Sequence, residues 1–219
     1  GFRPRKPSVN KPKPTKHNSV VFNQLCKLIP NGMVRNLATE YEVDKKSRTF
    51  SPWSHVVSLL YCQLTHSIGL NDLCDALRHH SAKLFAVRGA TPPSRNGLSH
   101  ANKVRNADMM EALFWKMLDH LQNQFPGFGP AGRYKGLPRR FKRTVYSIDS
   151  STIPLVANCM DWAKHRRRKA AAKLHLCLNL QTFLPSFAVI EEGSHHVSSR
   201  MIALCARLAA GEIAVFDKA

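Results

Sequence analysis

The spacing of the hydrophobic residues changes once along the chain, near residue 143, and this change limits the folds open to it. From about residue 20 to residue 124, apolar residues recur at helical spacing. After residue 143, short segments alternate polar and apolar residues, as half-buried strands do. The segment between them is rich in Gly, Pro and basic residues and predicts a linker. The pattern therefore predicts a helical domain followed by an α/β domain.

The helical part predicts six helices. They are expected over residues 20–29, 32–43, 53–66, 72–87, 94–106 and 109–125. Ser51 as N-cap and Pro52 at the first helical position open the third helix, Asn71 precedes the fourth, and Asn106 or Asp108 begins the last. The last helix has residues spaced for one apolar face, which are Met110, Leu113, Phe114, Met117, Leu118 and Leu121.

Four strands are expected in the second part, over residues 143–149, 173–182, 185–192 and 212–217. A helix over residues 198–211, capped by Ser198 or Ser199 and stopped by Gly211, precedes the last strand. This order predicts three antiparallel strands and then a right-handed crossover to a strand parallel to the first. The expected domains are a basic, Pro-rich disordered arm (1–19), a helical domain (20–124), a linker (125–142) and the α/β core (143–219).

The charge of the chain favours a polyanionic partner. Thirty-three Lys and Arg residues against fourteen Asp and Glu give a net charge of +19, which favours nucleic acid before membrane. No apolar run approaches the roughly 18–20 residues that cross a bilayer. The six cysteines include no C-x-x-C pair, so zinc is not expected, and they indicate a reducing compartment, the cytosol. The basic arm (1–19) either contacts nucleic-acid phosphates or is a solvated linker.

Two segments are candidates for DNA contact. The segment 94–106 has side chains suited to groove edges, and with the helices before it could form a helix-turn-helix-like unit: Arg95, Asn96, Ser99, His100, Asn102, Lys103 and Arg105. An ordinary amphipathic surface helix is an equal alternative. The second segment is a basic loop over 161–173, and its candidates for phosphate contact are Lys164, Arg166, Arg167, Arg168, Lys169 and Lys173. A solvated charged loop is the alternative. The basic linker adds three DNA-binding candidates, Arg139, Arg140 and Lys142.

Two aspartates end strands that are expected to be parallel neighbours. Asp149 closes the first strand and Asp217 closes the last. Ligands of open α/β sheets gather at the carboxyl ends of strands, and two adjacent carboxylates repel unless a cation lies between them. Their oxygens suit Mg²⁺ or Mn²⁺, and a metal pair can activate water and stabilise a leaving oxygen in phosphoryl transfer. The alternative is that both are turn or cap residues, with Asp149 in an Asx-turn.

The stretches VYSIDSSTIPL, KLHLCLNLQTFLPSFAVIEEGSHH and IAVFDKA resemble the catalytic core of bacterial DDE-class insertion-sequence transposases, in particular the insertion-sequence-4-like group. That core is ribonuclease-H-like. The helical half is similar to the N-terminal domain that accompanies it, so the resemblance covers about residues 20–219. It implies that Asp149 and Asp217 are the first two catalytic, metal-binding acids, with Mg²⁺ or Mn²⁺ as cofactor.

The resemblance also implies DNA cleavage and strand transfer at insertion-sequence ends by a cut-and-paste route. The implied partners are double-stranded DNA, as terminal inverted repeats and target, and no membrane, with a homodimer of the complete protein left open. The implied location is cytoplasmic, at the nucleoid.

The sequence departs from the family's pattern in two places. The family's third acid is a glutamate in a Tyr…Arg…Glu…Lys signature beyond the second aspartate, and no such signature follows Asp217. His195-His196 stands where many relatives carry His-Asp. We therefore expect a C-terminally truncated transposase, inactive as these residues alone, with Glu191, Glu192 or Asp161 as a substitute third ligand if it is active. The alternative is an inactive DNA-binding protein that occupies terminal repeats. An RNA-binding protein is a weaker alternative because no RNP-like or KH-like signature is present.

Overall fold

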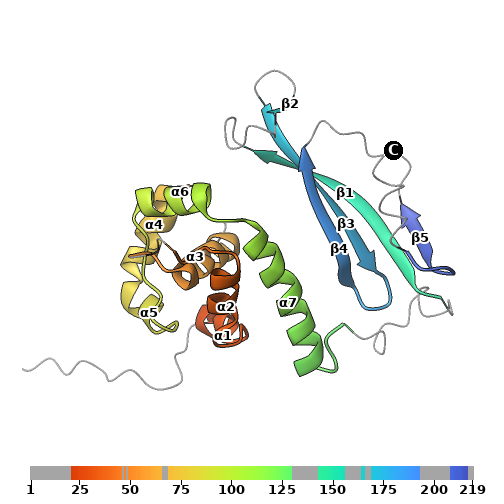
Figure 1. Ribbon diagram of the computed structural model, residues 1–219, viewed down its shortest axis with the longest axis horizontal. Coiled ribbons are helices and arrows are strands. Elements are labelled where there is room, and N and C mark those ends of the chain that lie inside the picture. Colours follow the sequence, from red (N-terminus) through yellow and green to blue (C-terminus); the bar gives the residue numbers. More distant parts are fainter. Residues whose placement is uncertain are drawn as a thin grey trace, which may run out of the picture. The chain divides into compact units, whose positions relative to one another are not determined.

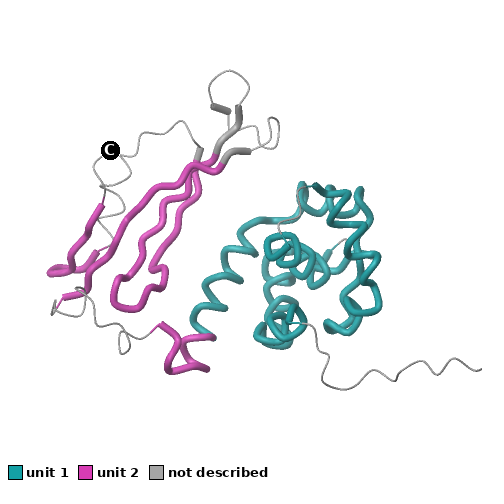
Figure 2. Tube along the Cα trace, turned by 180° about the vertical axis from the view of Figure 1, so that it is seen from behind, with its two compact units in different colours: residues 1–120 teal, residues 121–219 magenta. Residues whose placement is uncertain are grey.

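The computed structural model describes residues 21–45, 47, 49–65, 69–129, 143–155, 164–165, 169–192 and 208–216. Within these residues, seven helices precede a mixed β-sheet (Figure 1). This order confirms the predicted fold class. The chain divides into two compact units, residues 1–120 and residues 121–219 (Figure 2). None of the helices described is both long enough and apolar enough to cross a membrane.

Several helices begin where the sequence predicts. The helices are α1 (Val21–Lys27), α2 (Met33–Glu40), α3 (Pro52–Thr65), α4 (Leu70–His79), α5 (Ser81–Phe85), α6 (Arg95–Val104) and α7 (Asp108–Gln124). The Ser51 hydroxyl accepts a hydrogen bond from the Ser54 N–H at 3.1 Å, which confirms the cap before Pro52. The Asn106 side chain accepts from the Asp108 N–H at 2.9 Å, so Asn106 caps the first N–H of α7, which begins at Asp108.

Two helical predictions are wrong in part. The helix expected over 72–87 is two helices, because the backbone at His80 leaves helical geometry between α4 and α5. In one unbroken helix, Val87 would lie about 80° around the axis from Leu77, whereas both belong to the same core cluster. The break lets the chain bring both inward. In addition, α4 begins at Leu70, before Asn71, with Gly69 in the cap position.

The apolar face of α7 is the predicted one except at Phe114, since Met110, Leu113 and Met117 lie in or against a buried cluster. Met109 and Leu113, one turn apart, are 3% and 6% exposed and pack into the cluster that holds Leu37 and Val56. Phe114 was predicted on that face but is 47% exposed. Because α7 docks through Met109 and Leu113, the position of Phe114 points away from the cluster.

The cluster that holds Leu77 and Val87 also fixes the position of α6. Leu98 is 0% exposed and Ala101 4%, and they pack with Leu73 and Leu77 of α4. Burying a leucine side chain stabilises a fold by about 1.5–3 kcal/mol.

Three of the cysteines described are buried, Cys26, Cys74 and Cys177, and burial raises the pKa of the Cys26 thiol to about 11. They therefore act as small apolar residues.

The sheet contains the predicted strands in the predicted order. Its strands are β1 (Val145–Leu155), β2 (Lys164–His165), β3 (Lys169–Asn179), β4 (Leu184–Glu192) and β5 (Ile213–Phe216). β3 is antiparallel to β1, β2 and β4, and β5 is parallel to β1. This mixed sheet is consistent with a partial ribonuclease-H-like core. Most of the helix predicted over 198–211 lies outside the described residues, and Gly211 has a φ of +91° in a turn before β5.

Two strands extend further than the sequence predicts. Asp149 does not end β1, which continues to Leu155, and β3 begins at Lys169 rather than at Lys173. The segment 161–173 is therefore a loop only in part, because it also contains β2 and the start of β3. The reason is that Ser150–Leu155 pair with Ala170–His175, which satisfies backbone groups that a loop would leave to water.

We predict that Leu98→Ala lowers the free energy of unfolding of the helical unit by about 2–5 kcal/mol, because it leaves a cavity under α6. Val104→Ala on the same helix is the matched control, since Val104 is 58% exposed, and it should change stability by less than about 0.5 kcal/mol. Urea unfolding measures both. Equal effects of the two substitutions would contradict the anchoring of α6 by Leu98.

Candidate functional site

The first of the two predicted catalytic aspartates lies where β1 and β5 stop pairing. The two strands pair in parallel from Val145 with Ile213 to Ile148 with Phe216. Asp149 follows Ile148, and its side chain is exposed. Its carboxylate Oδ1 accepts a hydrogen bond from the Ser150 N–H at 2.8 Å. Asp217, the other predicted acid, follows Phe216 in the sequence and lies outside the described residues.

Successive residues of β1 face opposite sides of the sheet around Asp149. Ile148 is 2% exposed, and the Ser150 hydroxyl contacts the buried His175. Side chains alternate along a strand, so Asp149 projects to the side opposite Ile148 and Ser150. The carboxylate is therefore held on the sheet with solvent around it.

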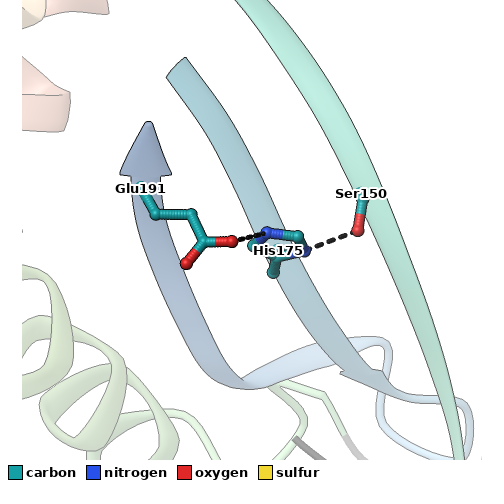
Figure 3. Close-up of polar contacts among 3 residues, drawn as sticks. All are labelled: Ser150, His175 and Glu191. Atoms are coloured by element: carbon teal, nitrogen blue, oxygen red, sulfur yellow. Dashed lines mark hydrogen bonds and ion pairs between the residues drawn. The ribbon is translucent and has the colours of Figure 1, made fainter. Parts of the chain in front are cut away.

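A buried polar chain on that opposite side joins three strands and was not predicted from the sequence. The Ser150 Oγ lies 2.6 Å from His175 Nδ1, and His175 Nε2 lies 2.8 Å from Glu191 Oε1 (Figure 3). His175 is 1% exposed and Glu191 8%. The residues come from β1, β3 and β4. In the alternating segment KLHLCLN, His175 stands opposite the leucines and on the same side as Lys173 and Asn179, so the pattern carried no signal of its burial.

The order serine, histidine, carboxylate also occurs in nucleophilic catalysis, where the histidine takes the hydroxyl proton. Here the histidine and the carboxylate are almost completely covered, so they cannot exchange with a substrate in solution. The hydrogen-bonded chain Ser150–His175–Glu191 instead connects β4 and β3 to β1 at the residue next to Asp149. It also engages Glu191, one of the alternative third ligands, on the side opposite Asp149. The side chain of Glu192 and all of Asp161 lie outside the described residues.

Helix α6 presents most of its predicted DNA-contacting side chains to solvent. The Ser94 side chain caps the helix by accepting from the Gly97 N–H at 3.0 Å. Leu98 and Ala101 are buried. The exposed side chains are Arg95, Asn96, Ser99, His100 and Lys103. A helix docked by one apolar stripe and polar on its outer face has the form that a groove-reading helix requires.

Asn102 and Arg105, the other two candidates on this segment, contact the protein itself. Asn102 Oδ1 lies 2.7 Å from His55 Nε2. The Arg105 guanidinium donates to the Phe50 carbonyl and lies over the Phe50 ring, 5.3 Å from its centroid. These partners are 47 and 55 residues away in sequence, so the spacing of the segment alone gave no sign of them.

The other predicted phosphate contacts are less fully placed. The backbone of Lys164 belongs to β2 and that of Lys169 to β3, while Lys173 is half-buried in β3. The remaining predicted contacts, Arg139, Arg140, Lys142, Arg166, Arg167 and Arg168, lie outside the described residues. Among the residues that are described, no group of three or more His, Cys, Asp or Glu could hold a metal ion.

Comparison with known proteins gives one match. Residues 17–87 match the model of a domain of unknown function, DUF4372. No curated protein and no solved structure matches the chain. The matched segment contains α1 to α5 and ends before α6.

We predict that the buried polar chain stabilises the sheet. His175→Ala removes the imidazole that joins Ser150 to the buried Glu191 carboxylate, and breaking such a buried pair costs about 3–5 kcal/mol. Ser151→Ala is the control, since Ser151 is an exposed neighbour in β1, with an expected effect below about 0.5 kcal/mol. Chemical unfolding followed by far-UV circular dichroism compares them. If His175→Ala lowered the free energy of unfolding as little as the control does, the Ser150–His175–Glu191 hydrogen bonds would not stabilise the sheet.

We also predict that acid weakens the helical unit through His55. Burial lowers the pKa of His55 below its ordinary value of 6.5, the hydrogen bond to Asn102 raises it in part, and the Arg105 charge lowers it. The unfolded chain therefore binds the proton more readily. The stability contributed by neutral His55 is fully present above pH 6.5 and is lost as the pH falls from there through the folded pKa.

The measurement for His55 is the melting temperature as a function of pH. His55→Gln should reduce the drop in melting temperature between about pH 7.5 and about pH 5.5. His79→Gln, at an exposed histidine of α4, should leave the drop as large as in the unsubstituted chain. If His55→Gln retained the whole drop, His55 would not be its source.

Proposed function

We propose that the chain is part of a DNA transposase, in which α6 reads DNA and the edge of the sheet at Asp149 holds Mg²⁺ or Mn²⁺ for phosphodiester cleavage and strand transfer. The observation that carries the proposal is the parallel pairing of Ile148 with Phe216. In the sequence, an aspartate follows each member of this pair. Two acids at equivalent positions of neighbouring parallel strands could bind a metal ion together.

Covalent geometry limits how far apart the two carboxylates can be. Consecutive Cα atoms are about 3.8 Å apart, so Asp217 is tethered within one residue of Phe216, the partner of Ile148. Asp149 is exposed rather than buried among apolar side chains, which leaves its oxygens open to a cation. Hard carboxylate oxygens fit Mg²⁺ and Mn²⁺.

Each part of the sheet has a role in this proposal. The bound metal would stabilise the charge that develops on the oxygens of the reacting phosphate. Asp149 and Asp217 would hold the metal. The Ser150 N–H fixes the orientation of the Asp149 carboxylate, and the Ser150–His175–Glu191 chain fixes the backbone of β1 from the other side.

The helical unit supports the DNA-binding part of the proposal independently. The outer face of α6 combines cationic and amide side chains on a helix that Leu98 holds in place, in a chain of net charge +19. Arginine and asparagine are the side chains that most often contact guanine and adenine in the major groove. The same face supports the second candidate function, a DNA-binding protein that occupies terminal repeats without cutting.

We predict that Asp149→Asn and Asp217→Asn each weaken Mn²⁺ binding while leaving DNA binding in place. Two carboxylates bind divalent metal weakly, so electron paramagnetic resonance of Mn²⁺ should be recorded with duplex DNA present, whose phosphates complete the ligand shell. Asp119→Asn, at an exposed acid of α7, is the control and should bind as the unsubstituted chain does. Unchanged Mn²⁺ binding by Asp149→Asn would exclude the metal site and leave the repeat-occupying function.

We predict that Arg95→Ala and Asn96→Ala change sequence preference more than affinity. Loss of one good base contact costs about 1–3 kcal/mol at one base pair. The measurement is selection of bound duplexes from a randomised pool, followed by titration of the selected and a random duplex. Ala107→Ser, just beyond α6 at an exposed position, is the control. Equal weakening of selected and random DNA by the α6 variants would contradict base reading.

A further inference from the structure

One stretch of the helical unit carries cations without acids, and the function proposed above uses only part of it. From Ala76 to Ala107 the sequence contains six Lys and Arg residues and no Asp or Glu, with Asp75 before the stretch and Asp108 after it. The stretch covers the last residues of α4, all of α5 and all of α6. A surface with cations and no acids attracts a polyanion. The proposed function gives a role to the cations of α6 and none to those of α4 and α5.

The cations of this stretch differ in whether the protein itself already uses them. Arg88 and Arg105 each donate to a backbone carbonyl, so the fold fixes their positions. Arg78 of α4 uses its Nη1 in an ion pair with Asp75, whose Oδ1 is 3.0 Å away. The Arg78 side chain is 64% exposed, which leaves its Nη2 and Nε N–H groups open to a ligand from solvent. Because both members of this pair are exposed, the pair contributes little to stability.

Arg78 lies close to the first turn of α6, where the predicted base contacts begin. Helices α4 and α6 pack in one buried cluster (Figure 1), and Arg95 is the first residue of α6. Burial raises the pKa of the Cys74 thiol, the charges of Arg78 and Arg95 lower it, and Asp75 raises it. Both arginines therefore lie near the same thiol, Arg78 from α4 and Arg95 from α6. A polyanion bound at Arg95 passes close to Arg78.

We propose that Arg78 contacts a phosphate of the DNA backbone beside the base pairs that α6 reads, a role that rests on the proposed function of α6. A guanidinium offers planar N–H groups that match two phosphate oxygens, and Nε and Nη2 of Arg78 form such a fork. Asp75 holds the guanidinium through Nη1 and at the same time repels the phosphate. The contact carries no sequence information, and it fixes the position of the reading helix on the duplex.

The experiment uses the ion pair itself, because its two members have opposite effects on a bound phosphate. A random-sequence duplex is titrated against the full chain at several salt concentrations. Arg78→Gln should weaken binding and reduce the log–log salt slope by about 0.9, the value for one lost phosphate contact. Asp75→Asn should strengthen binding, because it removes the repelling carboxylate and keeps the arginine. If the pair were only structural, both substitutions would break it and both would act in the same direction.

The ion pair of Lys116 with Glu40 is the matched control, since it is also exposed and its atoms are 3.3 Å apart. Lys116→Gln and Glu40→Gln should leave the affinity and the slope unchanged at about 0.1 M salt and above, where charges more than about 10 Å from the duplex are screened. This control separates a local contact from the net charge of the chain. Circular dichroism checks that the four variants are folded.

A second measurement separates Arg78 from the base-reading residues. Arg78→Gln should weaken the duplex selected by the chain and a random duplex by the same factor, whereas Arg95→Ala should weaken the selected duplex more. Three results would overturn the Arg78 contact and leave the proposed function standing: an unchanged salt slope for Arg78→Gln, weaker binding by Asp75→Asn, or an equal effect of Lys116→Gln. An unsubstituted chain that binds no duplex would overturn both.

Discussion

The parallel pairing of β5 with β1 is the contact on which the account of this sheet depends. Strand β4 follows β3 after a short turn and pairs with it, whereas β5 follows β4 in the sequence but lies beside β1. A parallel neighbour requires such a crossover. It brings the carboxyl end of β5 beside the middle of β1, where Asp149 and Asp217 follow the last pair in the sequence. Without this pairing, the two acids would have no reason to act together.

Two further arrangements bear on function through positioning rather than contact with a substrate. The chain Glu191–His175–Ser150 crosses β4, β3 and β1 on the covered side of the sheet, so the residue beside Asp149 is fixed by two hydrogen bonds in series. In the helical unit, Leu98 and Ala101 set the rotation of α6 about its axis. That rotation decides which polar side chains reach solvent. In both cases buried residues determine what an exposed residue can touch.

The sequence predicted those features that depend on neighbouring residues. Ser51-Pro52 and Asn106 marked helix starts because capping acts over one turn, and alternation marked β4 because its side chains face two environments. The extension of β1 and β3 was missed because the basic run of 166–168 resembles a solvated loop, while the pairing that forms it is between Ser150–Leu155 and Ala170–His175. The sequence pattern also missed the inward orientation of Arg105 and the Ser150–His175–Glu191 hydrogen bonds, because the partners of these residues lie far away in sequence.

A disulfide test addresses directly whether Asp149 and Asp217 are neighbours, as the proposed metal site requires. Neighbouring strands lie about 4.8 Å apart, within the range of roughly 4.4–6.8 Å between the Cα atoms of bonded cysteines. A chain with Asp149→Cys and Asp217→Cys should therefore form a 149–217 disulfide on mild oxidation, identified by peptide mass spectrometry. Ser147→Cys with Val215→Cys, a pair in the observed register, is the control. Crosslinking of the control without crosslinking at 149 and 217 would contradict the shared acidic edge.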